Sequence, residues 1–447
     1  GEKLAVLPDL FANPTSELPE FGMDLTWSVF RHDSNNDGKP EKVYIYGGMR
    51  MGGSNYYALD VTDRNNPKLL FAIKAGSGGY DKLGQTWSQP TVAAIRYKGD
   101  VRNVIIFGGG YDAQHEVSDI VYAADSVGNA VYIADAETGQ LLEAVSASDN
   151  ADMKFSVVAQ PKTLDATGDG LVDHIYFGDL GGQVFRVDLD NRTSATGLVV
   201  RAKTLAKVGQ TGSGGGVANQ RRFYEPPTVA LFMDANNRVF AAVAVGSGYR
   251  SRPLNESTTD HFFTFFDYDV PRADILTGAS LQPVIGMTDM AEVKPDATVT
   301  VDIAGKKGWY VTFPDTGEKV INSALMANYK LVFSSYVPTV EGGDNCSPVI
   351  GRTKLYNVSL AKGGFPSGFV VKDNSVLGLG GDPQLVTIEN PNPPPGGGDD
   401  GLGGDLAGEG GSCSDIAIVA GTDVEEFEGC VRASLKRTRW TEKLKQQ

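Results

Sequence analysis

Three short segments of the chain repeat one pattern: QPTVA (residues 89–93), QPKTL (residues 160–164) and PPTVA (residues 226–230). The second residue of each segment is proline, and these prolines lie 71 and 66 residues apart. Each segment precedes an apolar run that ends in glycine. Repeated hairpin units that are marked in this way by proline and glycine are typical of a β-propeller. The spacing exceeds the roughly 40–45 residues of an ordinary blade, so we expect either inserted loops or units that span more than one blade. An array of two-sheet sandwiches is the alternative.

The apolar runs themselves favour strands. They are rich in β-branched and aromatic residues and are followed by glycine, as in VYIY (residues 43–46), VIIF (residues 104–107) and IYF (residues 175–177). A second strand that ends at an aspartate often follows. Examples of this second strand are residues 57–60, 131–135 and 184–188. The pattern predicts an all-β fold made of hairpins.

Composition narrows the class of protein. The chain has 447 residues and a formal net charge of −15, which disfavours nucleic acid as a partner and suits divalent cations. No run of 18 apolar residues occurs, so no transmembrane helix is expected. The first residues form no signal peptide and include no initiator methionine. We therefore expect a fragment of a secreted protein whose targeting signal lies upstream.

A change of composition near residue 390 predicts the domain organisation. Prolines and then glycines and aspartates dominate residues 390–412, and this composition cannot form a packed core. We expect a propeller over residues 1–385, a linker over residues 386–412 and a short tail over residues 413–447. The three cysteines are too few for a disulfide framework. Of these, Cys413 and Cys430 are predicted to pair, leaving Cys346 as a free thiol.

Two aspartate-rich segments are the candidate metal sites, and we call them the first acidic loop (Asp33–Glu41) and the second acidic loop (Asp165–Asp173). Both place oxygen-bearing residues at positions 1, 3 and 5 and glycine at position 6, which is the pattern of a calcium-binding loop. The predicted ligands of the first loop are Asp33, Asn35, Asp37, the carbonyl of Lys39 and Glu41. Those of the second loop are Asp165, Thr167, Asp169, the carbonyl of Leu171 and Asp173.

These loops depart from an EF-hand. Position 12 is Tyr44 in one and Tyr176 in the other, so the acidic ligand must come from position 9. Strands rather than helices are predicted to follow both loops. The alternative interpretation is a polar turn without metal, because Asp, Asn and Gly also satisfy turn geometry. The segment Asp234–Arg238 has a similar opening but a cation at position 5, so we interpret it as an ordinary turn.

Other catalytic signals are weak. None of the four histidines has a partner at metal-binding spacing, and no nucleophile elbow or phosphate-binding loop occurs. The turn Asp135–Gly139 resembles the blade turn of quinoprotein-type propellers, although a plain hairpin turn explains the same residues. The sequence therefore predicts a protein that is not an enzyme. A quinoprotein-like dehydrogenase is the alternative, but the vicinal cysteines often found near its cofactor are missing from this chain.

Several glycine-rich and aromatic motifs follow one another in a fixed order. They are GGMR (residues 47–50), YYALDVTD (residues 56–63), GQTWSQP (residues 84–90), FGGGYD (residues 107–112) and GSGYRSRPL (residues 246–254). Together these motifs resemble the C-terminal domain of PilY/PilC-type type IV pilus proteins, and the resemblance covers about residues 20–380. The resemblance implies a modified, about seven-bladed, quinoprotein-like propeller with inserted loops. It also matches the family's calcium loop to Asp165, Asp169 and Asp173.

The resemblance further implies a biological setting. Family members act in pilus biogenesis, in calcium-dependent control of extension and retraction during twitching motility, in adhesion and in virulence. The implied partners are pilin subunits or minor pilins at the pilus tip, and a host or abiotic surface. The implied location is the fimbrium, cell surface or outer membrane after periplasmic transit. The Arg-Gly-Asp tripeptide of some members does not occur here, so integrin binding is not implied. A purely structural propeller is the third interpretation.

Overall fold

The computed structural model describes thirteen stretches of the chain. These are residues 7–12, 21–35, 37–117, 123–195, 197–210, 216–270, 275–277, 281–295, 303–338, 351–377, 381–388, 414–420 and 423–431. Cys346, Cys413 and residues 389–412 lie outside them, so the predicted disulfide and most of the predicted linker remain predictions.

The described residues form six antiparallel or mixed sheets, and the first three follow one another in sequence. The first contains β1 (Ser28–His32), β2 (Lys42–Gly48), β3 (Asn55–Asp60) and β4 (Lys68–Lys74). The second contains β5 (Thr91–Tyr97), β6 (Asp100–Gly108), β7 (Val131–Asp135) and β8 (Leu141–Val145). The third contains β9 (Lys162–Leu164), β10 (His174–Gly178), β11 (Gln183–Leu189) and β12 (Val199–Lys207). The strands predicted at residues 43–46, 104–107 and 175–177 lie within β2, β6 and β10, which confirms them.

The remaining sheets complete the order. The fourth contains β13 (Thr228–Met233), β14 (Val239–Gly246), β15 (His261–Asp267), β17 (Gly308–Thr312) and the parallel edge strand β16 (Ala291–Val293). The fifth contains β18 (Leu325–Ala327), β19 (Lys330–Val337), β20 (Arg352–Leu360) and β21 (Pro366–Leu377). The sixth pairs β22 (Gln384–Ile388) with β23 (Ser414–Ala420) and β24 (Asp423–Val431), so it joins a strand at the predicted propeller boundary to strands of the predicted tail.

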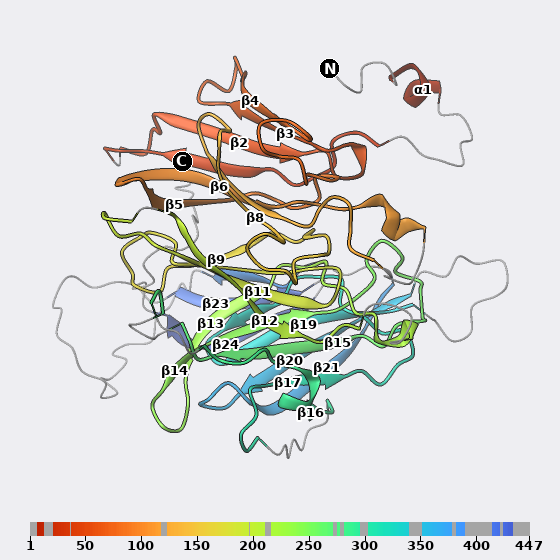
Figure 1. The fold of residues 1–447 in the computed structure, drawn as a ribbon. Coiled ribbons are helices and arrows are strands. Elements are labelled where there is room, and N and C mark those ends of the chain that lie inside the picture. The colour runs from red at the N-terminus through yellow and green to blue at the C-terminus, as the bar shows by residue number, and fades with distance from the viewer. Residues whose placement is uncertain are drawn as a thin grey trace.

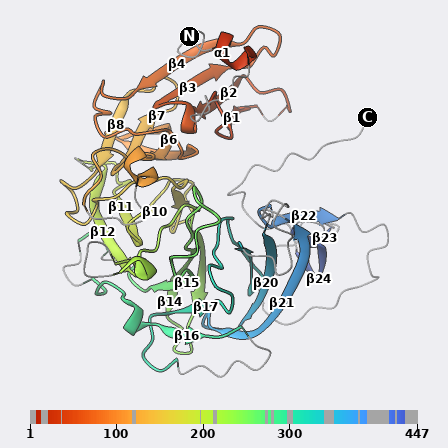
Figure 2. The same ribbon diagram turned by 90° about the vertical axis from the view of Figure 1, so that its right-hand side faces the viewer.

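Helices are short. The described residues include one α-helix, α1 (Leu7–Ala12), and four single-turn 3₁₀ helices. The latter are η2 (Arg50–Gly52), η3 (Ala113–Glu116), η4 (Val217–Asn219) and η5 (Met287–Asp289). In Figures 1 and 2 the sheets follow one another in an arc from the N-terminal sheet to the C-terminal ones. Their first strands contact in succession, β1 with β5, β5 with β9, β9 with β13 and β13 with β18. This arrangement of blades is that of the predicted β-propeller.

The repeated proline segments form the joints between blades. Ser28, the first residue of β1, donates a hydrogen bond from its hydroxyl to the carbonyl of Pro90 at 2.5 Å. Thr91, at the start of β5, donates to the carbonyl of Pro161 at 2.7 Å. Thr228, at the start of β13, donates to Ala324 at 2.6 Å. The repeat in the sequence is therefore a repeat of contacts between neighbouring blades.

The glycines that end the second strands explain the close spacing at these joints. A Cβ added to Gly108 would lie 2.2 Å from the carbonyl oxygen of Val157, which precedes the third blade. A Cβ added to Gly246 would lie 2.3 Å from the Cβ of Val320, which precedes the fifth blade. Since real Cβ atoms do not approach this closely, only glycine allows the next blade's chain to cross there.

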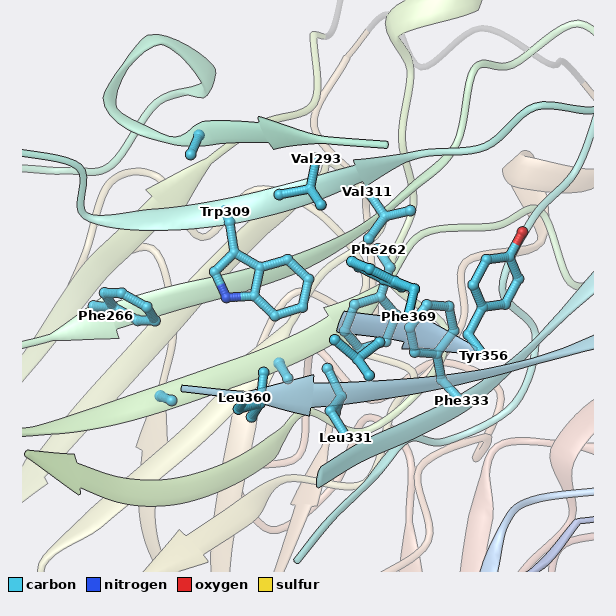
Figure 3. Packing of buried hydrophobic residues seen from close by; sticks show 14 of the residues in the cluster. Phe262, Phe266, Val293, Trp309, Val311, Leu331, Phe333, Tyr356, Leu360 and Phe369 are labelled. Carbon is cyan, nitrogen blue, oxygen red and sulfur yellow. The ribbon is translucent and has the colours of Figure 1, made fainter. Parts of the chain in front are cut away.

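Each pair of neighbouring blades encloses its own hydrophobic core. Four such clusters lie between the first and second, second and third, third and fourth, and fourth and fifth sheets. In the last of them, Phe262 stacks on Phe333 with ring centroids 3.9 Å apart, and Phe333 stacks on Tyr356 at 4.8 Å (Figure 3). The indole N–H of Trp309 donates to the carbonyl of Gly364 at 2.9 Å, which satisfies the polar group of this buried ring.

A buried ion-pair network also couples the third and fourth blades. Arg186 on β11 is fully buried and donates to Asp188 at 2.7 Å and to Asp267 on β15 at 2.6 Å. His174 contacts the same Asp188 carboxylate at 2.9 Å. The carboxylates satisfy the guanidinium, so the network positions the two blades against each other.

Candidate functional site

The two acidic loops occupy equivalent places in their blades. The first connects β1 to β2 and the second connects β9 to β10, so both link the first strand of a blade to its second strand. Antiparallel pairing of β1 with β2 and of β9 with β10 brings the two ends of each loop together. The predicted strand after each loop is present, and no helix flanks either loop within the described residues.

The first acidic loop is held by its own side chains. The backbone N–H of Ser34 donates to Glu41 at 2.8 Å, and the N–H of Gly38 donates to Asp33 at 3.0 Å. The N–H of Lys39 donates to Asp37 at 2.7 Å, and Asp37 N–H donates to the Asn35 amide oxygen at 3.0 Å. The N–H of Ser34 is also the main reason that the pKa of Glu41 is lowered, because it stabilises the charged carboxylate.

The second acidic loop has the same construction. The N–H of Ala166 donates to Asp173 at 2.9 Å, and the N–H of Gly170 donates to Asp165 at 2.8 Å. The N–H of Leu171 donates to Asp169 at 2.9 Å. The Thr167 hydroxyl lies 3.4 Å from Asp165 and 3.1 Å from Asp173, so it joins the two ends of the loop.

Three hydrogen bonds therefore recur at the same positions of both loops. Position 2 donates to the carboxylate at position 9, position 6 to position 1, and position 7 to position 5. The glycine at position 6 has a left-handed φ in both, +84° at Gly38 and +87° at Gly170, with open space around it. Backbone geometry, and not crowding, requires glycine there. The sequence pattern thus corresponds to one shared three-dimensional scaffold.

The donor set of both loops is chemically suited to a hard cation. It consists of carboxylate, amide, hydroxyl and carbonyl oxygens, which are the ligands that Ca²⁺ prefers. One carboxylate oxygen of Asp33 is buried and has no hydrogen-bond partner among the described residues. A buried anionic oxygen without a partner is unfavourable unless a cation or water satisfies it.

The structure brings only some of the predicted ligands of the second acidic loop together. Asp165, Thr167 and Asp173 contact one another or a common partner, whereas the Asp169 carboxylate accepts the N–H of Leu171. In the part of the chain that the structure describes, no three His, Cys, Asp or Glu side chains are gathered into a metal-binding group. The carboxylates accept backbone N–H groups instead. The ligand set of each loop remains a prediction.

In the turn interpreted as ordinary and in the turn Asp135–Gly139, the aspartate is satisfied by groups of the same turn. Asp234 accepts the side chain of Arg238 at 2.8 Å and the N–H groups of Asn236 and Arg238 at 2.8 and 2.9 Å. Asp135 accepts the N–H groups of Glu137 and Thr138, both at 3.0 Å. In the turn Asp234–Arg238, the guanidinium of Arg238 takes the place beside Asp234 that a bound cation would need, as the cation at position 5 of the sequence indicated.

A second group of residues belongs in large part to the sequence motifs, but its convergence was not predicted. It lies at the opposite end of the blades, where the second strands finish and the next blades begin. We call it the arginine–aromatic face; it comprises Arg50, Trp87, Tyr111, Arg222, Tyr224, Tyr249, Arg250 and Arg252. Four of the motifs supply six of these residues, and Arg222 and Tyr224 lie outside the motifs. Only the fold brings them together, because they come from segments up to 202 residues apart.

These observations define an all-β propeller. Proline segments form the joints between its blades, and two of the loops between first and second strands are acidic. Residues 17–209 match the family model of the PilY1 beta-propeller domain, which confirms the resemblance to PilY/PilC-type proteins. Both acidic loops lie inside this matched region. The propeller fold is likewise that of the crystal structure of the Pseudomonas aeruginosa PilY1 C-terminal domain, with a TM-score of 0.59 at 17% identity over 89% of this chain and 83% of that one.

Curated relatives agree with this assignment. The type IV pilus biogenesis factor PilY1 homolog of Xylella fastidiosa is 25% identical over 80% of this chain and 25% of its own length. The type IV pilus biogenesis factor PilY1 of Pseudomonas aeruginosa strain PAO1 is 30% identical over 32% of this chain and 11% of its own length. The chain therefore spans a quarter or less of these relatives. Neither relative is named as an enzyme. Among the described helices, none has the length and apolar character needed to cross a membrane.

Proposed function

We propose that this chain is the non-enzymatic, calcium-binding propeller of a type IV pilus-associated protein that supports pilus biogenesis. The match to the PilY1 propeller over residues 17–209 supports the pilus assignment. The relatives named as pilus biogenesis factors point the same way. Binding of pilin subunits or minor pilins, adhesion to a host or abiotic surface, and a place at the pilus tip belong to this proposal.

One observation carries the calcium part of the proposal: the same three N–H to carboxylate hydrogen bonds recur in two loops far apart in sequence. The residues that would hold the ion are Asp33, Asn35, Asp37, Lys39 and Glu41 in one loop and Asp165, Thr167, Asp169, Leu171 and Asp173 in the other. Bound Ca²⁺ supplies positive charge among three carboxylates that otherwise repel one another. Occupancy should therefore order the loop and the strand that follows it.

The regulatory part of the proposal concerns the second acidic loop. Ordering of this loop would fix the start of β10, which pairs with both β9 and β11. Calcium-dependent ordering of one blade is a local change that a neighbouring protein can sense at the surface. We infer that occupancy of this loop tunes pilus extension against retraction, and thus twitching motility.

Isothermal titration calorimetry of the full chain with calcium chloride tests the ligand assignment. We expect two binding events, with Kd in the range of about 10⁻⁷ to 10⁻³ M. Asp169→Ala should remove one event while the far-ultraviolet circular dichroism stays that of the parent, since the loop contributes little to the core. Asp37→Ala should remove the other event. Asp234→Ala, in the turn filled by Arg238, is the matched control and should leave both.

Unchanged calcium stoichiometry in Asp169→Ala would show that the ligand assignment is wrong. If binding is lost but piliation and twitching of the producing strain stay normal, the site is structural and the regulatory proposal fails. The quinoprotein alternative predicts a different result, namely uptake of the quinone cofactor with its characteristic absorbance after incubation. We expect no such absorbance.

A further inference from the structure

The arginine–aromatic face lies on the side of the propeller away from the acidic loops. Arg50 follows β2, Tyr111 follows β6 and Tyr249 follows β14, so these three residues come from the connections between second and third strands. Trp87 and Tyr224 precede the first strands β5 and β13. Five separate segments therefore meet at this face. None of the residues assigned to calcium takes part in it.

Stacked rings form the base of this face. Trp87 stacks on Tyr111 with centroids 4.6 Å apart, and Tyr224 stacks on Tyr249 at 6.4 Å. Trp87 and Tyr224 are 6.1 Å apart, so the rings form one continuous group. All four rings are buried. Their hydroxyl groups are used internally, since both Tyr111 and Tyr224 contact the hydroxyl of Ser251. The hydroxyl of Tyr249 also has an internal partner, the carbonyl of His115, so the hydroxyls of these tyrosines are satisfied within the protein.

Arginines cover this base. The guanidinium of Arg50 lies 4.7 Å from the centre of the Trp87 ring, and Arg222 lies 4.1 Å from that of Tyr249. Arg50 and Arg250 remain 31% and 40% exposed at their side chains. These partly exposed arginines gather positive charge on a chain whose net charge is −15, and Asp24, Glu116 and Glu225 balance part of it.

Three arginines of this face are partly exposed, and they differ in how they are paired; Arg252, 37% exposed, lies 3.9 Å from Glu116. Arg250 forms an ion pair with the buried carboxylate of Glu225. Arg50 has Asp24 as its ion-pair partner, but the 3.7 Å separation is longer than a hydrogen bond. The pKa of Arg50 is lowered, first by burial and then by the nearby positive charge of Arg250. The guanidinium of Arg50 has no hydrogen-bonded carboxylate, and such a group favours an added anion beside it.

The backbone at Arg50 supports a role for its side chain. Arg50 has φ of +50°, the left-handed region in which a residue with a Cβ is strained. Glycine would adopt this conformation at lower cost. Strain retained at a residue whose side chain lies on a functional surface is a common feature of binding sites.

The residues around the arginines indicate that the anion they bind is a carboxylate of a protein. Met23 and Leu254 are large apolar residues that are about half exposed, at 45% and 52%. Met23 adjoins Asp24 in the sequence, and Leu254 lies two residues beyond Arg252. Tryptophan, tyrosine and arginine with apolar neighbours are the composition of protein–protein hot spots. A polyanion such as nucleic acid would be repelled by the rest of this acidic chain.

We propose that Arg50, which covers the ring of Trp87, and Arg250 form a docking site for an acidic segment of a protein partner, and that the exposed side chains of Met23 and Leu254 serve as its apolar flanks. The segment presents one Asp or Glu carboxylate to the guanidinium groups and an apolar side chain to the flanks. The identity of the partner rests on the proposed function: in a pilus-associated protein, the first partners to test are pilin subunits.

The direct test uses the full chain and an array of overlapping 15-residue peptides that cover the pilins and minor pilins of the organism encoding it. A second copy of the array replaces each Asp and Glu by Asn and Gln. We expect binding to acidic peptides that is lost in the amide copies. In solution, Arg50→Glu should weaken the best peptide by at least about tenfold, as expected for reversal of one charge in a close pair.

Two glycine substitutions separate binding from folding. Arg50→Gly removes the guanidinium and relieves the left-handed strain, so it should lose binding while its melting temperature stays equal or rises. Lys98 is the matched control, since it is also basic and has a left-handed φ of +51°, but it lies in the turn between β5 and β6 at the end of the acidic loops. Lys98→Gly should bind like the parent.

Three results would overturn the docking site: no bound peptide, equal binding of acidic and amide peptides, or parental affinity in Arg50→Glu. Inorganic phosphate that binds as tightly as the best peptide would also overturn it, because the ligand would then be a free phosphate. A deletion strain distinguishes the two proposals. If the strain remains piliated, the proposed function fails; if it is bald and the Arg50→Glu chain restores normal pili, only the docking site fails.

Discussion

The five-residue strand β10 has an aspartate at each side, and their surroundings are opposite. Asp173, just before β10, belongs to the second acidic loop and accepts N–H groups from Ala166 and Thr167, seven and six residues earlier. Asp179, just after β10, is fully buried next to Leu180, which belongs to the same buried cluster as Trp87 and Tyr111. It accepts the N–H groups of Gly181 and Gln183 at 3.0 and 2.9 Å. The first end of the blade is partly exposed, and we call it the open end, whereas the other, the closed end, is buried by packing.

The largest expected difference between the two ends is in the pH dependence of stability. Burial raises the pKa of Asp179 to about 8, against roughly 3.9 in an unfolded chain. Between these values the folded state binds more protons than the unfolded state, so the free energy of unfolding falls as pH rises. This one group contributes a slope of up to about 1.4 kcal/mol per pH unit. Asp179→Asn should remove that slope, as measured by urea unfolding at pH 5, 6.5 and 8.

Asp190 supplies the control for this measurement. Its pKa is lowered, chiefly by the hydrogen bond from Arg192, so its stabilising effect is already complete at pH 5 and disappears only in stronger acid. Asp190→Asn should therefore shift stability equally at all three pH values. A slope between pH 5 and 8 that Asp179→Asn leaves unchanged would show that Asp179 is ionised throughout.

The next largest effect concerns the closed end itself. Trp87 is 9% exposed and stacks on Tyr111 beneath Arg50. Trp87→Ala should lower the free energy of unfolding by about 3–5 kcal/mol, the usual result of deleting a buried indole. Trp87→Phe keeps a ring on Tyr111 and should cost less than half as much. Guanidinium chloride unfolding measures both values.

Leu69 on β4 is the control for the packing argument, because it is 63% exposed. Leu69→Ala should change stability by no more than about 0.5 kcal/mol. If Trp87→Ala is as mild as this control, the rings do not form a rigid base, and the docking surface proposed above them loses its support.

The contrast between the acidic loops and the buried end of the blades also explains which features could be predicted from the sequence. The acidic loops are held by hydrogen bonds between residues at most seven positions apart, so their spacing in the sequence already contains their geometry. The strands at residues 43–46, 104–107 and 131–135 were likewise predictable from local composition. What the sequence does not contain is where the carboxylate oxygens point, because N–H groups of the loop compete with a cation for them.

The arginine–aromatic face was not predictable for a different reason. The hydroxyl of Tyr249 donates to the carbonyl of His115, 134 residues away, and Arg50 covers the ring of Trp87 from another blade. Such contacts depend on the angle between blades, which no local pattern specifies. The signal was present only as the unexplained aromatic and basic residues at the ends of the glycine motifs.

The next prediction concerns the effect of calcium on stability through the two acidic loops. Calcium chloride at 100 times Kd should stabilise the chain by about 2.7 kcal/mol for each occupied site, and a chelator should reverse the effect. Without calcium, Asp165→Ala should destabilise more than Asp169→Ala, because Asp165 accepts the N–H groups of Gly168 and Gly170 whereas Asp169 accepts one N–H. Differential scanning fluorimetry with and without chelator checks both. Equal melting temperatures in the two conditions would contradict calcium binding.

The smallest expected effect lies between the two ends, at the joints that the proline repeat marks. The hydroxyl of Thr91 donates to the carbonyl of Pro161 in the next blade, and Thr91→Val removes this hydrogen bond while keeping the side-chain shape. We expect a loss of about 1 kcal/mol in the free energy of unfolding. Thr163 on β9 makes no such contact to a neighbouring blade among the described residues, so Thr163→Val should stay within about 0.5 kcal/mol of the parent. Equal urea midpoints for the two variants would mean that packing of the blade cores alone determines the spacing of the blades, and that the repeated hydroxyl contacts add nothing to it.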